Sequence, residues 1–257
     1  MNGMRQPILR LKGLSVAFGG LLALRDVSFD VYPGEIVGLI GPNGAGKTTL
    51  FHAVSGYLWP RSGEVWFDGH RVTGRPPYLL ARMGIARTFQ IVRPFPQLSV
   101  LENVMVGAFL AEGRRAGARR AALEILEWTG LADRAYAAAR ELTLAGRKRL
   151  EIARALALRP RLLLLDEVVA GLNPSEADAT VRLILAIRER GITIVAVEHI
   201  MRVIMQISDR IVVLHHGEKI AEGPPGEVAS NPLVVEAYLG TQESGAGKGA
   251  ASRAAGG

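Results

Sequence analysis

Residues 37–50 read VGLIGPNGAGKTTL, an apolar run followed by a glycine-rich loop, a lysine and two threonines. The apolar run predicts a buried strand, and the residues after Lys47 predict a helix. Glycines let the backbone curl closely around a phosphate, while the amides of the loop and of the helix N-terminus donate hydrogen bonds to it. This stretch therefore predicts a phosphate-binding loop between a strand and a helix, and an α/β fold.

The loop itself, GPNGAGKT, matches the P-loop pattern, and the strand before it and the helix after it are the context that this pattern requires. Lys47 would add a mobile cation, and the Thr48 hydroxyl would reach Mg²⁺. The alternative is a glycine-rich turn that contains a lysine by chance. The expected nucleotide-binding residues are Gly41, Pro42, Asn43, Gly44, Ala45, Gly46, Lys47, Thr48 and Thr49.

A second acidic motif, LLLLDE, ends at Glu167 after another continuous apolar run. Asp166 at the end of this buried strand would hold Mg²⁺ through water, and Glu167 could polarise an attacking water molecule. Taken alone, such a pair is more often a strand end or a helix cap, but the P-loop favours the functional interpretation. The separation of Asp166 from Lys47 far exceeds one strand crossover, which indicates an insertion between them.

The pattern along the chain predicts a split core. Residues 5–90 are expected to form its first part, with an antiparallel β portion that includes a hairpin at GEVWFDGHRV, and GIARTFQ is expected to form a short strand. Residues 91–158 turn Ala-rich and helical, and they predict an inserted helical subdomain. Residues 159–240 resume with strands at GITIVAVEH and DRIVVLHHGEKIAEG, so the main sheet should be parallel or mixed. Residues 241–257, rich in Gly, Ala and Ser, predict a flexible tail.

Composition limits the class of protein. Of the 257 residues, 49% are hydrophobic, yet charges interrupt every apolar run before the roughly 18 residues that a membrane span needs. Without a signal-like start or any cysteine, we expect a soluble chain in a reducing compartment. The net charge of +7 raises the question of nucleic acid. The arginines of EGRRAGARR lack interleaved aromatic residues, however, and they favour a solvated helix face, so we expect no nucleic-acid partner.

In order and spacing, these motifs resemble the ATP-binding subunit of ABC transporters from about residue 8 to residue 240. The resemblance implies that Phe18 stacks on adenine, that Gln90 senses Mg²⁺ and the membrane partner, and that His199 contacts the γ-phosphate. It also implies that AGLNP, residues 170–174, crosses to a second subunit. Taken singly, Phe18 could belong to the core, Gln90 to an ordinary loop and His199 to a helix cap.

Three further segments, DEVVAGLNPSE, VEHIMRVIMQISDRIVVLHHGEKIAEGPPGEV and NPLVVEAYLG, are similar to the ATPases of branched-chain, or hydrophobic, amino-acid importers. Related systems import urea or short amides, or export lipopolysaccharide. The resemblance implies an ATPase that uses ATP and Mg²⁺ and works as a head-to-tail dimer on the cytoplasmic face of a membrane. Its partners would be integral membrane permease subunits and, indirectly, an external solute-binding protein. A nucleotide-binding regulatory module with weak turnover is a rival, as is a soluble ABC protein acting on DNA or ribosomes.

The segment ELTLAGRKRLEIARAL, residues 141–156, stands where the family places its signature LSGGQ at a helix start. The ungapped register aligns residues 142–146 with those five positions, whereas a slip by one residue would require a deletion inside the helix, so we favour the former. Thr143 then keeps a hydroxyl that can cap the helix. Ala145 and Leu144 replace the two glycines, so an added methyl is expected where the phosphate approaches. Thr143, Ala145 and Gly146 are the expected signature contacts.

Cations follow this signature at Arg147, Lys148 and Arg149, where they oppose the helix dipole. Two interpretations remain open at this point. The cations could meet an anion presented by the partner subunit, or they could lie in solvent while their stems pack on the core.

Other departures from the family pattern lie near the acidic pair and after Gln90. Val168 replaces the usual proline, which predicts a looser turn beside Glu167, and Asn173 replaces an aspartate of the crossing loop. The segment IVRPFPQLSV is expected to contact the membrane subunit through Phe95 and Leu98, with core packing as the alternative.

Overall fold

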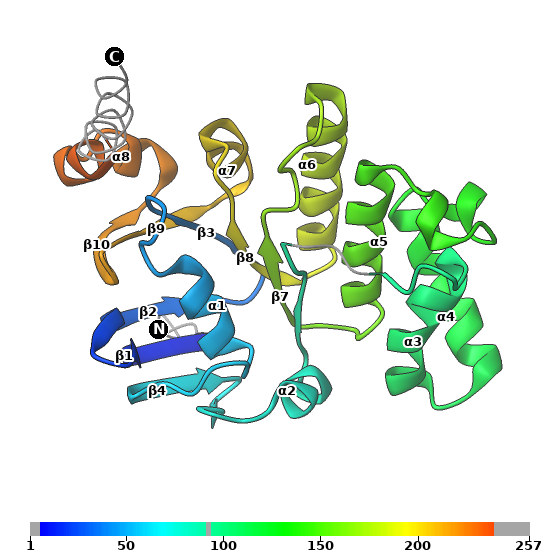
Figure 1. The fold of residues 1–257 in the computed structure, drawn as a ribbon, viewed down its shortest axis with the longest axis horizontal. Helices are drawn as coiled ribbons and strands as arrows, with labels where there is room; N and C mark the ends of the chain where they lie inside the picture. Colours follow the sequence, from blue (N-terminus) through cyan, green and yellow to red (C-terminus); the bar gives the residue numbers. More distant parts are fainter. Residues whose placement is uncertain (1–5, 91–93, 239–257) are drawn as a thin grey trace, which may run out of the picture.

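The computed structural model describes residues 6–90 and 94–238 (Figure 1). Residues 91–93 and the expected tail at 241–257 lie outside the described residues. Two sheets and a group of helices make up the fold, and in Figure 1 the smaller sheet and the helical group stand at opposite ends of the molecule.

The smaller sheet is antiparallel, with strand order β2-β1-β4-β5. Along its strands, successive side chains point alternately to a buried and to a more exposed face, and the buried positions are apolar. The hairpin expected at GEVWFDGHRV is confirmed as the pair of β4 and β5. The strands are β1 (Leu9–Phe18), β2 (Leu21–Val31), β4 (Ser62–Phe67) and β5 (His70–Arg71).

The larger sheet has the order β10-β9-β3-β8-β7-β6, and every neighbouring pair is parallel except β9 with β10. Its central strands are buried on both faces, which explains their uninterrupted apolar sequences. The expected mixed α/β core with an antiparallel N-terminal part is thereby confirmed. The strands are β3 (Ile36–Ile40), β6 (Ile85–Arg87), β7 (Leu162–Asp166), β8 (Thr193–Val197), β9 (Arg210–His215) and β10 (Glu218–Gly223).

Helices cover both faces of this sheet and create two cores. Along β3, Val37 and Leu39 pack with α1 and the smaller sheet, whereas Ile36 and Ile40 pack with the helices on the opposite face. Helix α1 lies between the two sheets, and α6, α7 and α8 lie on the other side of the larger sheet (Figure 1). The bounds are α1 (Lys47–Val54), α2 (Pro77–Met83), α6 (Pro174–Glu189), α7 (Met201–Ile207) and α8 (Pro225–Ala229).

The helical block consists of α3 (Val100–Glu112), α4 (Arg115–Trp128) and α5 (Leu144–Leu156), with short 3₁₀ turns at Ala132–Arg134 and Ala139–Glu141. It follows β6 and precedes β7 in the chain, which explains the long interval between the P-loop and the acidic pair. A capping box between Ser99 and Glu102 fixes the start of α3. The expected solvated arginine face is confirmed, since Arg114, Arg115, Arg119 and Arg120 are all exposed.

Helix α2 is absent from the sequence-based predictions, although its signals are present in the chain. Pro77 occupies its first turn, and Gly84 in a left-handed conformation ends it. The segment is short, so its apolar periodicity is weak. Among the residues that the structure describes, no helix is long and apolar enough to cross a membrane.

Candidate functional site

The carboxyl ends of four parallel strands of the larger sheet meet at one edge. The P-loop follows β3, Gln90 follows β6, Glu167 follows β7 and His199 follows β8. Ligands of open α/β sheets bind outside these strand ends, where the loops can reach them. The topology therefore brings residues from four distant parts of the sequence to one place.

The P-loop depends on glycine at two crowded positions. A Cβ on Gly41 would lie 2.1 Å from the carbonyl oxygen of Leu214, and one on Gly46 would lie 2.7 Å from the carbonyl oxygen of Ala23. Gly46 also has φ 102°, which a side chain would disfavour, and it caps the N-terminus of α1. The small residues thus let the loop curl tightly, which leaves the first amides of α1 without partners in their own helix and available to a ligand.

Lys47 is held in place by the loop that it follows. Its Nζ donates to the carbonyl oxygens of Gly41 at 2.6 Å and Pro42 at 2.9 Å. Burial lowers the pKa of Lys47, while the carboxylates of Glu167 and Asp166 act to raise it. A buried cation with two acidic neighbours would gain from an anion at the loop, because the low local dielectric strengthens such an interaction.

A cavity of about 730 Å³ opens over this loop. Its lining joins seven of the nine expected P-loop residues to the three residues expected to act on the γ-phosphate end of the nucleotide. The lining residues are Ala23, Asn43, Gly44, Ala45, Gly46, Lys47, Thr48, Thr49, Gln90, Glu167 and His199. The structure thus gathers Gln90, Glu167 and His199 around the P-loop.

The Glu167 carboxylate is fixed by two side chains on opposite sides. Gln90 Nε2 donates to Glu167 Oε2 at 2.8 Å, and His199 Nε2 lies 2.6 Å from Glu167 Oε1. Each partner comes from a different strand end, and together they hold the carboxylate in the lining of the cavity. A carboxylate oriented in this way can accept a proton from a water molecule beside a bound phosphate.

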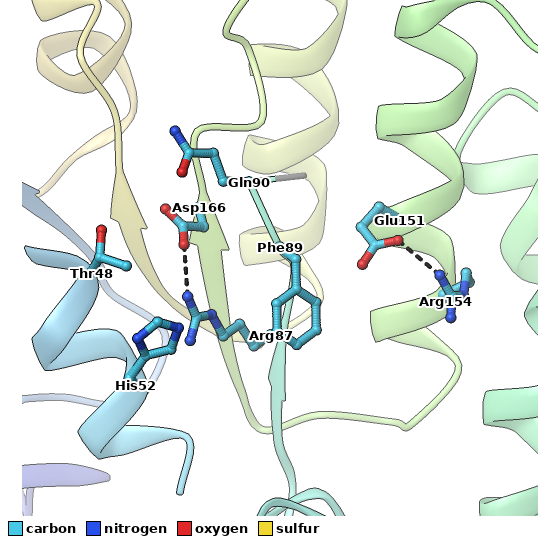
Figure 2. Close-up of a pocket in the computed structure, with 8 residues that line it drawn as sticks. All are labelled: Thr48, His52, Arg87, Phe89, Gln90, Glu151, Arg154 and Asp166. Atoms are coloured by element: carbon cyan, nitrogen blue, oxygen red, sulfur yellow. Dashed lines mark hydrogen bonds and ion pairs between the residues drawn. The ribbon is translucent and has the colours of Figure 1, made fainter. Parts of the chain in front are cut away.

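Asp166 is almost fully buried and faces a second, adjoining cavity of about 470 Å³ (Figure 2). Its Oδ2 accepts from Arg87 Nη2 at 2.8 Å, and its backbone amide donates to Thr88 Oγ1 at 3.0 Å. This ion pair is itself buried, so each charge depends on the other. Sequence reasoning missed Arg87, although the residue stands in the quoted strand GIARTFQ.

Thr48, Gln90 and Asp166 all line this second cavity. Figure 2 shows Thr48 on α1, Asp166 at the end of β7 and Gln90 after β6, with Glu151 and Arg154 of α5 on the other side of Phe89. A hydroxyl, an amide oxygen and one carboxylate form the hard oxygen set that Mg²⁺ prefers, together with water and substrate phosphates. Within the described residues, no group of three or more acidic or histidine side chains could hold a metal alone. The residues present therefore fit a nucleotide-bound Mg²⁺.

Phe18 lies at the end of β1 with 52% of its surface exposed. It does not line the P-loop cavity, but Ala23 of the same hairpin does. Its neighbour across the turn, Leu21, is also exposed. The aromatic ring is thus free to receive a flat apolar group beside the P-loop.

The signature residues lie away from the P-loop of their own chain, at the N-terminus of α5. Thr143 caps this helix, and its Oγ1 accepts from the Gly146 amide at 3.2 Å, in agreement with the ungapped register. Ala145 is only 8% exposed, so its methyl does not stand on the outer face of the helix. Leu144, 43% exposed, is the side chain that occupies this face.

The turn after Glu167 is held more firmly than the replacement of proline by Val168 predicts. Val168 is buried, and the Val169 amide donates to Glu198 Oε1 at 3.0 Å. Glu198 is buried and its Oε2 has no hydrogen-bond partner. Burial raises the pKa of Glu198 to about 7, although the amides of Val168 and Val169 and the cation of Lys148 oppose this shift. The sequence signal for Glu198 was its place directly before His199.

The sequence matches known protein families. A family model described as "ABC transporter" matches residues 24–170, and one described as "Branched-chain amino acid ATP-binding cassette transporter" matches residues 218–244. The chain is 41% identical over 253 residues to the high-affinity branched-chain amino acid transport ATP-binding protein BraF of Pseudomonas aeruginosa. It is 42% identical over 253 residues to the corresponding protein LivG of Escherichia coli. Both alignments cover 92% of this chain and 99% of the relative.

The fold is similar to those of solved ATP-binding cassettes. The ADP conformation of an ATP-binding cassette of an ABC transporter has a TM-score of 0.83 at 32% identity, covering 91% of this chain and 99% of that chain. A dimeric cassette in a post-hydrolysis state, bound to ADP and Pi, has a TM-score of 0.76 at 28% identity. That likeness covers 84% of this chain and 98% of that chain.

Replacing Arg87 by Met should destabilise the fold by about 3–5 kcal/mol, because it leaves the Asp166 carboxylate buried without its cation. Thermal and urea denaturation would measure this loss. Arg161→Met is a matched control, since the ion pair of Arg161 with Asp68 is exposed and should contribute at most about 1 kcal/mol. Equal losses for the two variants would contradict the importance of the buried pair.

Glu198→Gln should change how stability depends on pH. The pKa of Glu198 is raised in the fold, so its contribution is fully present below the unfolded pKa and is lost as pH rises through about 7. Relative to Glu198→Gln, the wild type should therefore lose about 2–3 kcal/mol of unfolding free energy between pH 5 and pH 8. Urea unfolding of both proteins at several pH values measures the difference, and parallel curves would refute it.

Proposed function

This chain belongs to the ABC transporter family of ATP-binding proteins, and from that premise we propose that it hydrolyses ATP to drive import of branched-chain amino acids. The observation that carries the proposal is the Glu167 carboxylate, held by Gln90 and His199 in the lining of the P-loop cavity. If Glu167 only ended a strand, nothing would require Gln90 and His199 to orient its carboxylate beside a phosphate-binding loop.

Binding of ATP would use the P-loop and the hairpin beside it. The triphosphate lies in the loop, where backbone amides and Lys47 donate to its oxygens. The adenine stacks on the exposed ring of Phe18. Thr48, Gln90 and Asp166 would hold Mg²⁺, which when bound neutralises charge on the phosphate oxygens.

Hydrolysis would begin with a water molecule placed beside the γ-phosphate. Glu167 accepts a proton as the water oxygen forms its bond to phosphorus, and the bond between phosphorus and the bridging oxygen breaks to leave ADP. His199 orients the carboxylate through Nε2, and its ring would contact the γ-phosphate. Gln90 holds the other carboxylate oxygen, so a displacement of the loop after β6 would release Glu167 from its catalytic position.

A complete site would need a second ATP-binding subunit. The first amides of α5 lack partners within their own helix, because the start of any helix leaves them free. The α5 residues do not line the P-loop cavity of their own chain. We therefore infer that these amides and the Thr143 hydroxyl would donate to the γ-phosphate held by a partner subunit in a head-to-tail dimer. The dimeric arrangement of the solved relative bound to ADP and Pi supports this assembly.

The membrane permease subunits would dock at the cavity beside Gln90. Phe95 is exposed there, with the Arg154 guanidinium 5.2 Å from the centre of its ring. Binding at this place would locate the chain at the cytoplasmic face of the membrane as a peripheral subunit. The permease and an external solute-binding protein, rather than this chain, would contact the amino acid, so the substrate class is supported by the names of the relatives.

The role of Glu167 is tested by Glu167→Gln, which keeps the size of the side chain but cannot accept the proton. The variant should bind ATP with Mg²⁺ and form dimers, yet its turnover should fall about a hundredfold or more. ATPase assays and size-exclusion chromatography with ATP measure both properties. Equal turnover of variant and wild type would refute the catalytic role and would favour a regulatory nucleotide-binding module.

The role of the α5 N-terminus is tested by Leu144→Glu. A carboxylate in the first turn favours the helix dipole, so folding should be preserved, but it would repel the partner's γ-phosphate. We expect ATP binding by the P-loop within about twofold of wild type and loss of ATP-driven dimerisation. Ala145→Gly is the matched control, since the Ala145 methyl is buried and dimerisation should be unaffected. Normal dimerisation of Leu144→Glu would contradict this arrangement.

A further inference from the structure

The backbone of Glu167 adopts a conformation that a non-glycine residue seldom uses. Its φ of 51° lies in the left-handed region, which costs about 1–2 kcal/mol for a residue with a side chain. Such a conformation persists only where the surroundings hold it. The direction of the Glu167 carboxylate follows from this backbone, so whatever holds the backbone also orients the proton acceptor.

Two short hydrogen bonds hold the backbone of Glu167 from opposite sides, beside a longer turn bond of 3.4 Å from the Ala170 amide to its carbonyl oxygen. Its amide donates to the carbonyl oxygen of Val197 at 2.9 Å, which ties the residue to β8. Its own carbonyl oxygen accepts from Lys148 Nζ at 2.6 Å. The second bond comes from outside the sheet, since Lys148 belongs to α5 of the helical block.

Lys148 differs from the two cations beside it. It is only 6% exposed, whereas Arg147 is exposed and Arg149 is partly so. Its ammonium group therefore points inward to the catalytic loop of its own chain, and it is available neither to solvent nor to a phosphate of the partner subunit. For Lys148, this geometry excludes both interpretations left open by the sequence, a contact with the partner's anion and an ammonium group in solvent.

The buried ammonium group is balanced by nearby carboxylates. Burial lowers the pKa of Lys148, whereas Glu198, Glu167 and Asp166 act to raise it. Glu198 also accepts from the Val169 amide, two residues after Glu167. The cation and this carboxylate thus hold the turn after β7 at two points, one on the carbonyl of Glu167 and one on the amide of Val169.

We propose that Lys148 is a positioning residue, which holds the Glu167 backbone so that its carboxylate meets the attacking water. This inference rests on the proposed function, because it assumes that Glu167 accepts the proton. Lys148 lies one helical turn after Leu144, at the end of α5 that would face the ATP of the partner subunit. A shift of α5 as the partner's nucleotide binds would therefore reach the catalytic glutamate of the same chain directly.

The test is a cycle of variants in the full-length chain. Lys148→Met keeps the length of the side chain but removes the donor. It should lower kcat for ATP hydrolysis by about tenfold to a hundredfold, as displacement of a reacting group by about an ångström does. The KM for ATP should stay within about twofold, because the P-loop is untouched. Arg120→Met removes an exposed cation from α4 and should change neither quantity.

The decisive measurement is the same substitution made in Glu167→Gln, with turnover followed over long times on radiolabelled ATP. A residue that acts only through Glu167 has nothing left to position there, so Lys148→Met should cause no further loss in that background. An unchanged kcat in the single variant would overturn the proposal. So would an equal loss in both backgrounds, which would indicate a general structural role.

Should Lys148→Met fail to fold, Lys148→Arg keeps a cationic donor at the same place. Turnover within about threefold of wild type supports the proposal, and a larger loss with intact ATP binding overturns it. Failure of the proposed function is distinguishable, because it is seen as equal turnover of wild type and Glu167→Gln. In that case no Lys148 variant could act through a catalytic Glu167, and the inference falls with it.

Discussion

Leu39, Val197 and Asp166 lie side by side in one row across β3, β8 and β7. This parallel register places the P-loop, the segment of His199 and the segment of Glu167 immediately beyond the row, at one edge of the sheet. Because side chains alternate along a strand, a slip of one residue in any strand would turn its apolar residues to the wrong core. Packing on both faces therefore enforces the register, and the register brings the phosphate-binding and proton-accepting groups together.

The charged groups at this sheet edge each have an oppositely charged or a hydrogen-bonding partner. Asp166 faces Arg87, the Glu167 carboxylate meets Gln90 and His199, and Lys148 lies near Glu198. Each pair reduces the cost of removing its members from water. In a low-dielectric surrounding such groups resist reorientation, so the site can be set before substrate arrives, which is how electrostatic stabilisation of a transition state works best.

Much of this could be predicted from sequence, because the responsible signals are local. The P-loop pattern, the apolar strand before Asp166 and the alternation in the N-terminal strands identify the fold and the residues that line the cavity. The functions of Arg87, Lys148 and Glu198 could not be predicted, since each depends on a partner from a distant segment. Sequence shows that Lys148 is a cation near a helix start, but only its hydrogen bond to the turn after β7 shows that it points inward.

Ala145 illustrates the same limit in a different way. The alignment gives the identity of the residue but not the direction of its methyl, which depends on how α5 rotates about its axis. Burial of that methyl leaves Leu144 on the outer face. The replacement of glycine by Ala145 is therefore expected to matter less for a partner's phosphate than the exposed side chain of Leu144.

The insertion of the helical block between β6 and β7 has a mechanical consequence. These are neighbouring strands at the edge of the larger sheet, so the block is attached through two adjacent strand ends and breaks no strand pairing in the centre. A tilt of the block about this attachment would strain the contacts that cross it, among them the hydrogen bond from Lys148 to the carbonyl oxygen of Glu167. A movement of the far helices of the block would therefore be passed through Lys148 to the backbone of Glu167.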